Sequence, residues 1–257
     1  MKVVMIGSGN GATVMGGRIA ASGHELLQVA ARNGEAAAGL AAEWGCGYTT
    51  RWEEVDPGAE LYIVSLSDRA FPELSQALSL PGRLVVHTAG AVSLDALASV
   101  SERHGVLYPL QSLRKEIRPF PEFPLLIDAS RPEDLETIET FARTIARKVQ
   151  RADDALRLKL HVAAIFANNF TNYLYTLAAD FCSREGVDFS LLLPIIRGTG
   201  SRLERYAPKD VQTGPAIRGD RPTMERHQEV LSKYRNMNEL YRLFSEQIQE
   251  YYKGVVR

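Results

Sequence analysis

The first twelve residues of the chain place a glycine-rich turn directly after a short apolar run. Residues 3–6 predict a buried strand, and residues 12–22 predict a helix. Between them, Gly7 permits a tight turn, Gly9 lets the backbone approach phosphates, and Ala12 lets the helix pack closely on the strand. The first N–H groups and the positive end of that helix favour an anion, typically a pyrophosphate. A turn without a ligand is the alternative, which this position between a strand and a helix disfavours.

The remainder of the first half alternates strand-like and helix-like segments. Strands that alternate with helices predict a parallel sheet covered on both faces. The predicted strands are residues 3–6, 26–30, 47–50, 61–66, 83–87, 106–108 and 124–128, and the predicted helices are residues 12–22, 35–44, 71–79 and 94–103.

The second half is predicted to be helical, with no convincing strand after Asp128. One helix is expected from Pro132 to about Lys148, and a long one from Asp154 to about Arg184. Shorter helical segments are expected at residues 189–197, 203–206 and 221–252. We therefore predict an α/β fold, with a doubly wound, mostly parallel sheet in residues 1–150 and an all-α domain in residues 151–257.

Composition excludes several broad classes of protein. The 257 residues are 45% hydrophobic and 24% charged, which is ordinary for a globular chain, and the net charge of -1 provides no basic field for nucleic acid. No apolar run approaches the roughly 20 residues needed to cross a bilayer, and the first apolar run is too short for a signal peptide. Cys46 and Cys182 fit no metal spacing. We expect a cytoplasmic protein with free thiols, no metal, and no nucleic acid or membrane partner.

The end of the second predicted strand indicates which nucleotide is bound. An acidic residue at this position usually holds the ribose hydroxyls of NAD. Here the sequence has Arg32 and Asn33 and no carboxylate. Because a carboxylate repels a 2′-phosphate and an arginine pairs with it, these residues favour NADP. The alternative is that Arg32 is an ordinary solvated charge.

Turns that follow later strands should line the cleft between pyrophosphate and nicotinamide, because ligands of open parallel sheets lie beyond the carboxyl ends of strands. These turns contain residues 65–67, residues 88–90 and, for substrate binding, Gln111. The predicted cofactor-binding residues are Gly7, Ser8, Gly9, Asn10, Gly11, Ala12, Arg32, Asn33, Ser65, Leu66, Ser67, Thr88 and Gly90.

Five motifs connect the chain to a known family, namely residues 6–11, 87–90, 108–112, 161–170 and 213–220. With them the chain resembles bacterial oxidoreductases that join a Rossmann-type domain to a helical domain of the DUF2520 type. These are relatives of pyrroline-5-carboxylate reductase and of the 6-phosphogluconate and hydroxyacid dehydrogenases. The resemblance implies an NADP-binding domain followed by a helical domain that forms a homodimer.

The resemblance does not carry over the catalytic residue. The hydroxyacid dehydrogenases use the lysine of a Lys-x-x-Asn-Asn motif as acid and base, and here Asn168 and Asn169 follow Ile165, which cannot carry a proton. His161 lies one helical turn earlier and is our first catalytic candidate. Asn168 and Asn169 are expected to orient the substrate or a water molecule, Asn168 as a substrate-binding residue and Asn169 as a further catalytic candidate. The alternative is that His161 has no catalytic role and is a helix histidine whose hydrogen bonds are satisfied within the domain interface.

Two further residues complete the predicted site. His87 ends a strand and is the second catalytic candidate, or else packs beside the cofactor. Arg218 can bind a substrate carboxylate, and Asp220 more simply caps the helix that contains Pro222.

A hydride delivered from NADPH to C=O or C=N leaves negative charge that must be protonated, a task that suits histidine. We therefore expect an NADP-dependent oxidoreductase acting on a small carbonyl or imine. The alternative, which Ile165 motivates, is an NADP-binding regulator or sensor without turnover.

Overall fold

The computed structural model describes residues 1–254, and the chain divides into two compact units, Met1–Phe170 and Thr171–Arg257. The sequence places the domain boundary near residue 151, whereas the structure divides the chain after Phe170. The difference arises because Asp154 and His161 are hydrogen-bonded to residues of the sheet unit, so that α5 belongs to the first unit. That the cofactor-binding and substrate-binding functions divide near residue 151 stays a prediction.

The first unit is built on a single eight-stranded sheet within residues 1–254, with the order β3-β2-β1-β4-β5-β6-β7-β8. Neighbouring strands are parallel except β6 and β7. The order reverses beside β1, which pairs with both β2 and β4, as in the doubly wound Rossmann-type fold. The strands are β1 (Lys2–Ile6), β2 (Glu25–Ala30), β3 (Gly47–Thr49), β4 (Leu61–Val64), β5 (Leu84–His87), β6 (His104–Pro109), β7 (Leu125–Ala129) and β8 (Val149–Arg151).

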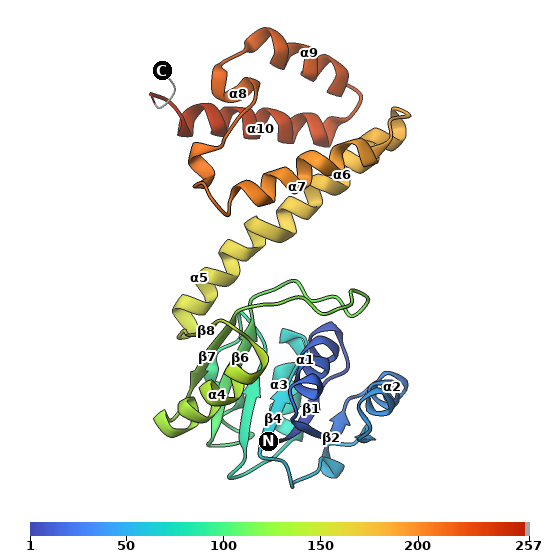
Figure 1. The fold of residues 1–257 in the computed structure, drawn as a ribbon, viewed down its shortest axis with the longest axis vertical. Coiled ribbons are helices and arrows are strands. Elements are labelled where there is room, and N and C mark those ends of the chain that lie inside the picture. The colour runs from blue at the N-terminus through green and yellow to red at the C-terminus, as the bar shows by residue number, and fades with distance from the viewer. Residues whose placement is uncertain (255–257) are drawn as a thin grey trace. The chain divides into compact units, whose positions relative to one another are not determined.

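Helices cover both faces of this sheet, as the sequence predicts (Figure 1). Val3 and Met5 of β1 pack in one core cluster with residues of α1 and α4, whereas Val4 and Ile6 pack in a second cluster with residues of α3. The alternation follows from the two-residue period of a strand. The helices of this part are α1 (Asn10–Ala21), α2 (Gly34–Trp44), α3 (Phe71–Ala77) and α4 (Pro132–Ile145).

The strand β8 corrects the expectation that no strand follows Asp128. It has three residues and runs parallel to β7 at the edge of the sheet, where Gln150 and Arg151 are exposed. A strand this short, with two polar residues, has no apolar pattern to reveal it. The predicted helix over residues 94–103 is also shorter, because only Leu94–Leu97 form a 3₁₀ turn.

The helical half contains the predicted long segment from Asp154 to Arg184 as α5 (Asp154–Ala164), a π-helix (Ile165–Phe170) and α6 (Thr171–Arg184). The predicted helix over residues 221–252 is interrupted at residues 232–234, where the Tyr234 N–H closes a turn onto the Leu231 carbonyl at 2.8 Å. Residues 203–206 form turns rather than a helix. The remaining helices are α7 (Leu193–Arg202), α8 (Pro215–Arg218), α9 (Arg221–Leu231) and α10 (Arg235–Tyr251).

Short 3₁₀ turns connect several elements, at Trp52–Glu54, Asp68–Ala70, Phe189–Leu192 and Pro208–Asp210. Within residues 1–254, every helix is too short or too polar to span a lipid bilayer.

Candidate cofactor and active site

The turn between β1 and α1 is pressed against the end of β4. Gly7 has φ +127°, a conformation that favours glycine, and a Cβ there would lie 2.2 Å from the Ser65 carbonyl oxygen. A Cβ at Gly11 would lie 2.6 Å from Ser65 Oγ. The backbone contact therefore requires glycine at position 7 for the turn to close over β4, and a larger residue at position 11 would have to displace the Ser65 side chain.

The same turn leaves an open space before α1. The helix begins at Asn10 with Gly9 as its N-cap, and no side chain of residues 1–254 caps its first N–H groups. A Cβ at Gly9 would meet no described atom within 4 Å. Across the neighbouring strand ends, Thr88 Oγ1 donates to Ser65 Oγ at 3.1 Å. Uncapped donors at the positive end of a helix, beside open space, fit the pyrophosphate of a dinucleotide.

Arg32 and Asn33 lie beyond the carboxyl end of β2, but they differ in what holds them. The guanidinium of Arg32 is 61% exposed and lies 3.0 Å from the Glu73 carboxylate. An exposed ion pair of this kind exchanges readily, so Arg32 remains available to a phosphate. Asn33 instead caps α2, with its Oδ1 accepting from the Ala36 N–H at 3.0 Å.

His161 on α5 meets Tyr108 at the end of β6. The Tyr108 hydroxyl and His161 Nδ1 share a hydrogen bond of 2.9 Å, with the ring centroids 5.9 Å apart in an edge-to-face arrangement. Gly90, after β5, lies directly beneath this pair, since a Cβ there would come within 2.6 Å of His161 Nδ1. The close approach of β5, β6 and α5 depends on the missing side chain at Gly90.

A cavity of about 340 Å³ in the first unit contains this pair. It brings together four residues that the sequence predicts for catalysis or substrate binding: Gln111, His161, Asn168 and Asn169. The other residues that line it are Tyr108, Leu110, Ser112, Ala164, Ile165 and Ala167. The cavity therefore has an apolar wall, a histidine–tyrosine pair and three amide side chains, which suits a small polar ligand.

Burial raises the pKa of Tyr108, an effect that the charge of Arg157 partly opposes and that of Asp68 reinforces. Arg157 is 1% exposed, and its Nη2 donates to the Val92 carbonyl at 2.5 Å and to Asp154 Oδ1 at 2.7 Å. The hydroxyl of Tyr108 therefore keeps its proton near neutral pH and can donate a hydrogen bond.

His87 lies away from solvent, with no exposed surface. Its Nδ1 accepts from the Ala89 N–H at 3.3 Å, and its Nε2 is 3.2 Å from the Ser93 carbonyl oxygen. Burial, with a smaller contribution from Arg157, lowers its pKa to about 4. Both ring nitrogens are thus engaged within the protein, which favours packing beside the strand end over the catalytic role expected for His87.

Arg218 and Asp220 belong to the second unit. Asp220 caps α9, accepting from the Thr223 N–H at 3.2 Å, as the sequence indicates. Arg218 is exposed at the end of α8, and its role in binding a substrate carboxylate stays a prediction.

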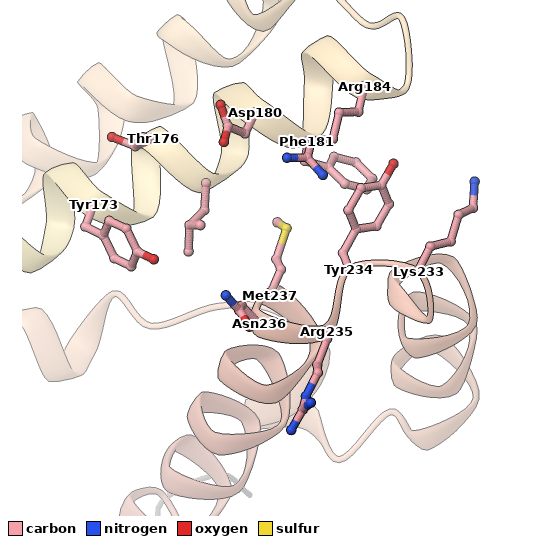
Figure 2. Close-up of a pocket in the computed structure, with 11 residues that line it drawn as sticks. Tyr173, Thr176, Asp180, Phe181, Arg184, Lys233, Tyr234, Arg235, Asn236 and Met237 are labelled. Carbon is pink, nitrogen blue, oxygen red and sulfur yellow. The ribbon is translucent and has the colours of Figure 1, made fainter.

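A larger cavity, of about 430 Å³, lies within the second unit between α6 and the start of α10. In Figure 2 the rings of Phe181 and Tyr234 lie next to each other, and their centroids are 5.2 Å apart. The Tyr234 hydroxyl donates to Glu185. None of the residues predicted for the cofactor or for proton transfer lines this cavity, so its greater size does not make it the better candidate.

The sequence alone did not single out Tyr108 or Arg157 as candidate site residues. Tyr108 lies in one of the motifs above, but it is 53 residues from His161, and no local spacing indicates their contact. Arg157 lies four residues before His161, which is one turn of the helix, and this was the available signal.

Comparisons with known proteins agree with this arrangement. The family model described as NADP oxidoreductase, coenzyme F420-dependent, matches residues 2–90, and that of DUF2520, a domain of unknown function, matches residues 123–248. No protein of curated function matches the chain. A solved structure from Bacteroides fragilis, named as a candidate NADP oxidoreductase, is 38% identical with a TM-score of 0.90, covering 97% of this chain and 98% of its own.

More distant solved structures share the fold. The 1-pyrroline-5-carboxylate reductase from Streptococcus pyogenes has 14% identity and a TM-score of 0.66, with 97% of this chain and 98% of that chain covered. The reductive aminase from Aspergillus terreus in complex with NADPH and ethyl levulinate has 18% identity and a TM-score of 0.70, with 97% and 94% covered. The chain therefore belongs to the family of NADP oxidoreductases in which a Rossmann-type domain precedes a DUF2520 domain, and its cofactor is NADP.

Proposed function

We propose that this oxidoreductase reduces a small carbonyl or imine compound in the cavity beside Tyr108 and His161. The observation that carries the proposal is the 2.9 Å contact between these two side chains within a cavity that three amide side chains also line. The fold relatives named for pyrroline-5-carboxylate reduction and for reductive amination support this class of substrate.

The cofactor supplies the hydride when it is bound, and the chain supplies its binding groups. In this proposal the N–H groups at the start of α1 hold the pyrophosphate, and Arg32 exchanges Glu73 for the 2′-phosphate. We expect Arg32→Ala to weaken NADPH binding by about tenfold, as for loss of a charge-assisted hydrogen bond. NADH binding should be unaffected. Fluorescence titration of both nucleotides measures this, and equal loss for both would contradict the role of Arg32.

Proton delivery is assigned to His161. With Tyr108 donating its hydroxyl proton to Nδ1, the proton of the imidazole lies on Nε2, free to pass to the oxygen or nitrogen that hydride transfer makes basic. Nε2 then regains a proton from bulk water. The Tyr108 hydroxyl, whose pKa burial raises, keeps its own proton and holds the imidazole in this tautomer. Asn168, Asn169 and Gln111 orient the substrate.

Two substitutions test this assignment with a panel of small carbonyl and imine compounds. His161→Ala should lower kcat by about 100-fold or more, the usual contribution of a general acid, and Tyr108→Phe should lower it less. NADPH affinity should stay unchanged in both, because neither residue lies at the glycine turn. Full activity of His161→Ala would refute the assignment of the proton donor.

A regulator or sensor without turnover is the second candidate. Ile165 favours it, because this apolar residue lines the cavity at the position where related enzymes of the hydroxyacid dehydrogenase type have lysine. Tight NADPH binding by the wild-type chain, with no oxidation of NADPH by any compound of the panel, would favour the sensor.

We further propose that two copies of the chain associate through the helical half. Leu158, Val162, Phe166 and Phe170 recur every four residues and are 48%, 50%, 65% and 51% exposed. Large apolar side chains in such a stripe seldom face water, and a second copy presents the same stripe in a two-fold arrangement.

A further inference from the structure

The loop between β6 and β7, residues 110–124, lies along α1 (Figure 1, green). Its first contact is at the glycine turn, where the Lys115 N–H donates to Asn10 Oδ1 at 3.4 Å. Asn10 is the first residue of α1. The loop thus brings the backbone of Lys115 next to the donors that were assigned above to the pyrophosphate.

Two later contacts hold the loop on the helix. A Cβ at Gly17 would lie 2.4 Å from the ring of Phe120, so the ring lies against the helix backbone. Arg18 donates to the Pro121 carbonyl at 3.3 Å and pairs with Glu122 at 2.8 Å. The loop is therefore held on α1 at two places, by Lys115 at the start of the helix and by residues 120–122 near Arg18.

The loop has three cationic side chains, and they differ in their partners. Arg114 pairs with Glu116 at 3.3 Å, and Arg118 pairs with Glu43 at 2.8 Å. Lys115 has no carboxylate within 4 Å among residues 1–254. It is thus the cation of this loop that remains available to an anion, and its flexible four-carbon stem can reach groups around its backbone position.

We propose that Lys115 is a further cofactor-binding residue, whose ammonium group binds the pyrophosphate held at the glycine turn. The proposal rests on the cofactor position given under Proposed function. A pyrophosphate carries charge that the uncapped N–H groups of α1 only partly balance, and a lysine beside them adds a full positive charge. The pyrophosphate is common to NADPH and NADH, so Lys115 should act on both nucleotides alike.

The same loop begins in the substrate cavity. Gln111 and Ser112 line that cavity, directly after Tyr108 and the end of β6. Residues 108–115 therefore connect the hydrogen-bond partner of His161 to the proposed pyrophosphate site. Lys115 is positioned by the segment that also positions Gln111.

The test compares nucleotide affinities in Lys115→Gln and the wild type by fluorescence titration, with inorganic pyrophosphate as a competitor. We expect the variant to bind NADPH and NADH each about fivefold more weakly, the size of one ion pair near a protein surface. Pyrophosphate should compete less well against NADH in the variant. Lys115→Arg should restore affinity, and Lys2→Gln, at the opposite end of β1, should leave it unchanged.

Phe120→Ala supplies a second variant, because it removes the ring that lies on Gly17, and on which the Arg118 guanidinium stacks, while the charge of Lys115 stays in place. It should weaken both nucleotides as Lys115→Gln does. Unchanged affinity in Lys115→Gln would overturn the proposal, and so would a loss confined to NADPH, which would place Lys115 at the 2′-phosphate. If neither Arg32→Ala nor Lys115→Gln weakens the binding of NADPH or of NADH, the cofactor position itself is wrong.

Discussion

At Gly90 the absence of a side chain allows the Tyr108–His161 pair to form. We expect Gly90→Ala to lower kcat by at least about tenfold and to destabilise the fold by about 1–3 kcal/mol, because the added methyl group would lie 2.6 Å from His161 Nδ1. Gly39→Ala is the matched control, since a Cβ there meets no described atom within 4 Å. Turnover and chemical unfolding of both variants measure the difference. A fully active Gly90→Ala would show that the pair tolerates displacement.

The buried imidazole of His87 makes stability depend on pH. Its pKa is about 4 in the folded chain and 6.5 when unperturbed. Between these pH values His87 is protonated in the unfolded chain and neutral in the folded chain. The unfolding free energy should therefore fall as pH drops from about 6.5 to 4, by up to about 3 kcal/mol, with the full stability present above that window.

Urea unfolding at a series of pH values tests this expectation. His87→Gln removes the titrating group and should flatten the dependence on pH in this range, whatever its effect on stability at pH 7. An equally steep dependence in the variant would assign the effect to other groups.

At the scale of elements, helix ends were predictable where a capping residue is present. Asp220 caps α9 and Asp153 caps α5, each by accepting from an N–H three residues later. We expect Asp220→Ala to lower the unfolding free energy by about 1 kcal/mol, the usual cost of losing an N-cap. The variant Asp210→Ala, at an exposed turn residue, should cost less. Thermal unfolding of the two variants measures the difference. Equal losses of unfolding free energy would show that the Asp220 cap has no specific stabilising effect.

Strands were predictable where they are apolar on both faces. The strands β1, β4 and β5 are fully buried except for Lys2, and their apolar runs are evident in the sequence. The edge strand β8 was missed because hydrogen bonds to β7, rather than any apolar pattern, define it.

At the scale of the whole molecule, the mass of the protein in solution tests the proposed dimer. Light scattering should give twice the mass of the chain for the wild type. The double variant Leu158→Glu, Val162→Glu should shift the mass toward the monomer, because charges would then enter the apolar stripe. Lys159→Gln changes a neighbouring exposed residue and should leave the mass unchanged. A wild-type monomer at high concentration would refute association through this surface.

The sequence by itself determined the doubly wound fold, the glycine turn and the preference for NADP, because each depends on local patterns of apolar residues, glycines and charges. It also placed His161 and Asn168–Asn169 on one continuous helical segment, which the structure divides into α5 and a π-helix. The tertiary structure alone decided that Tyr108 contacts His161, that His87 is enclosed, and that Lys115 lies beside Asn10. These contacts join residues that are far apart in the chain, and they arise only when the sheet and its loops pack together.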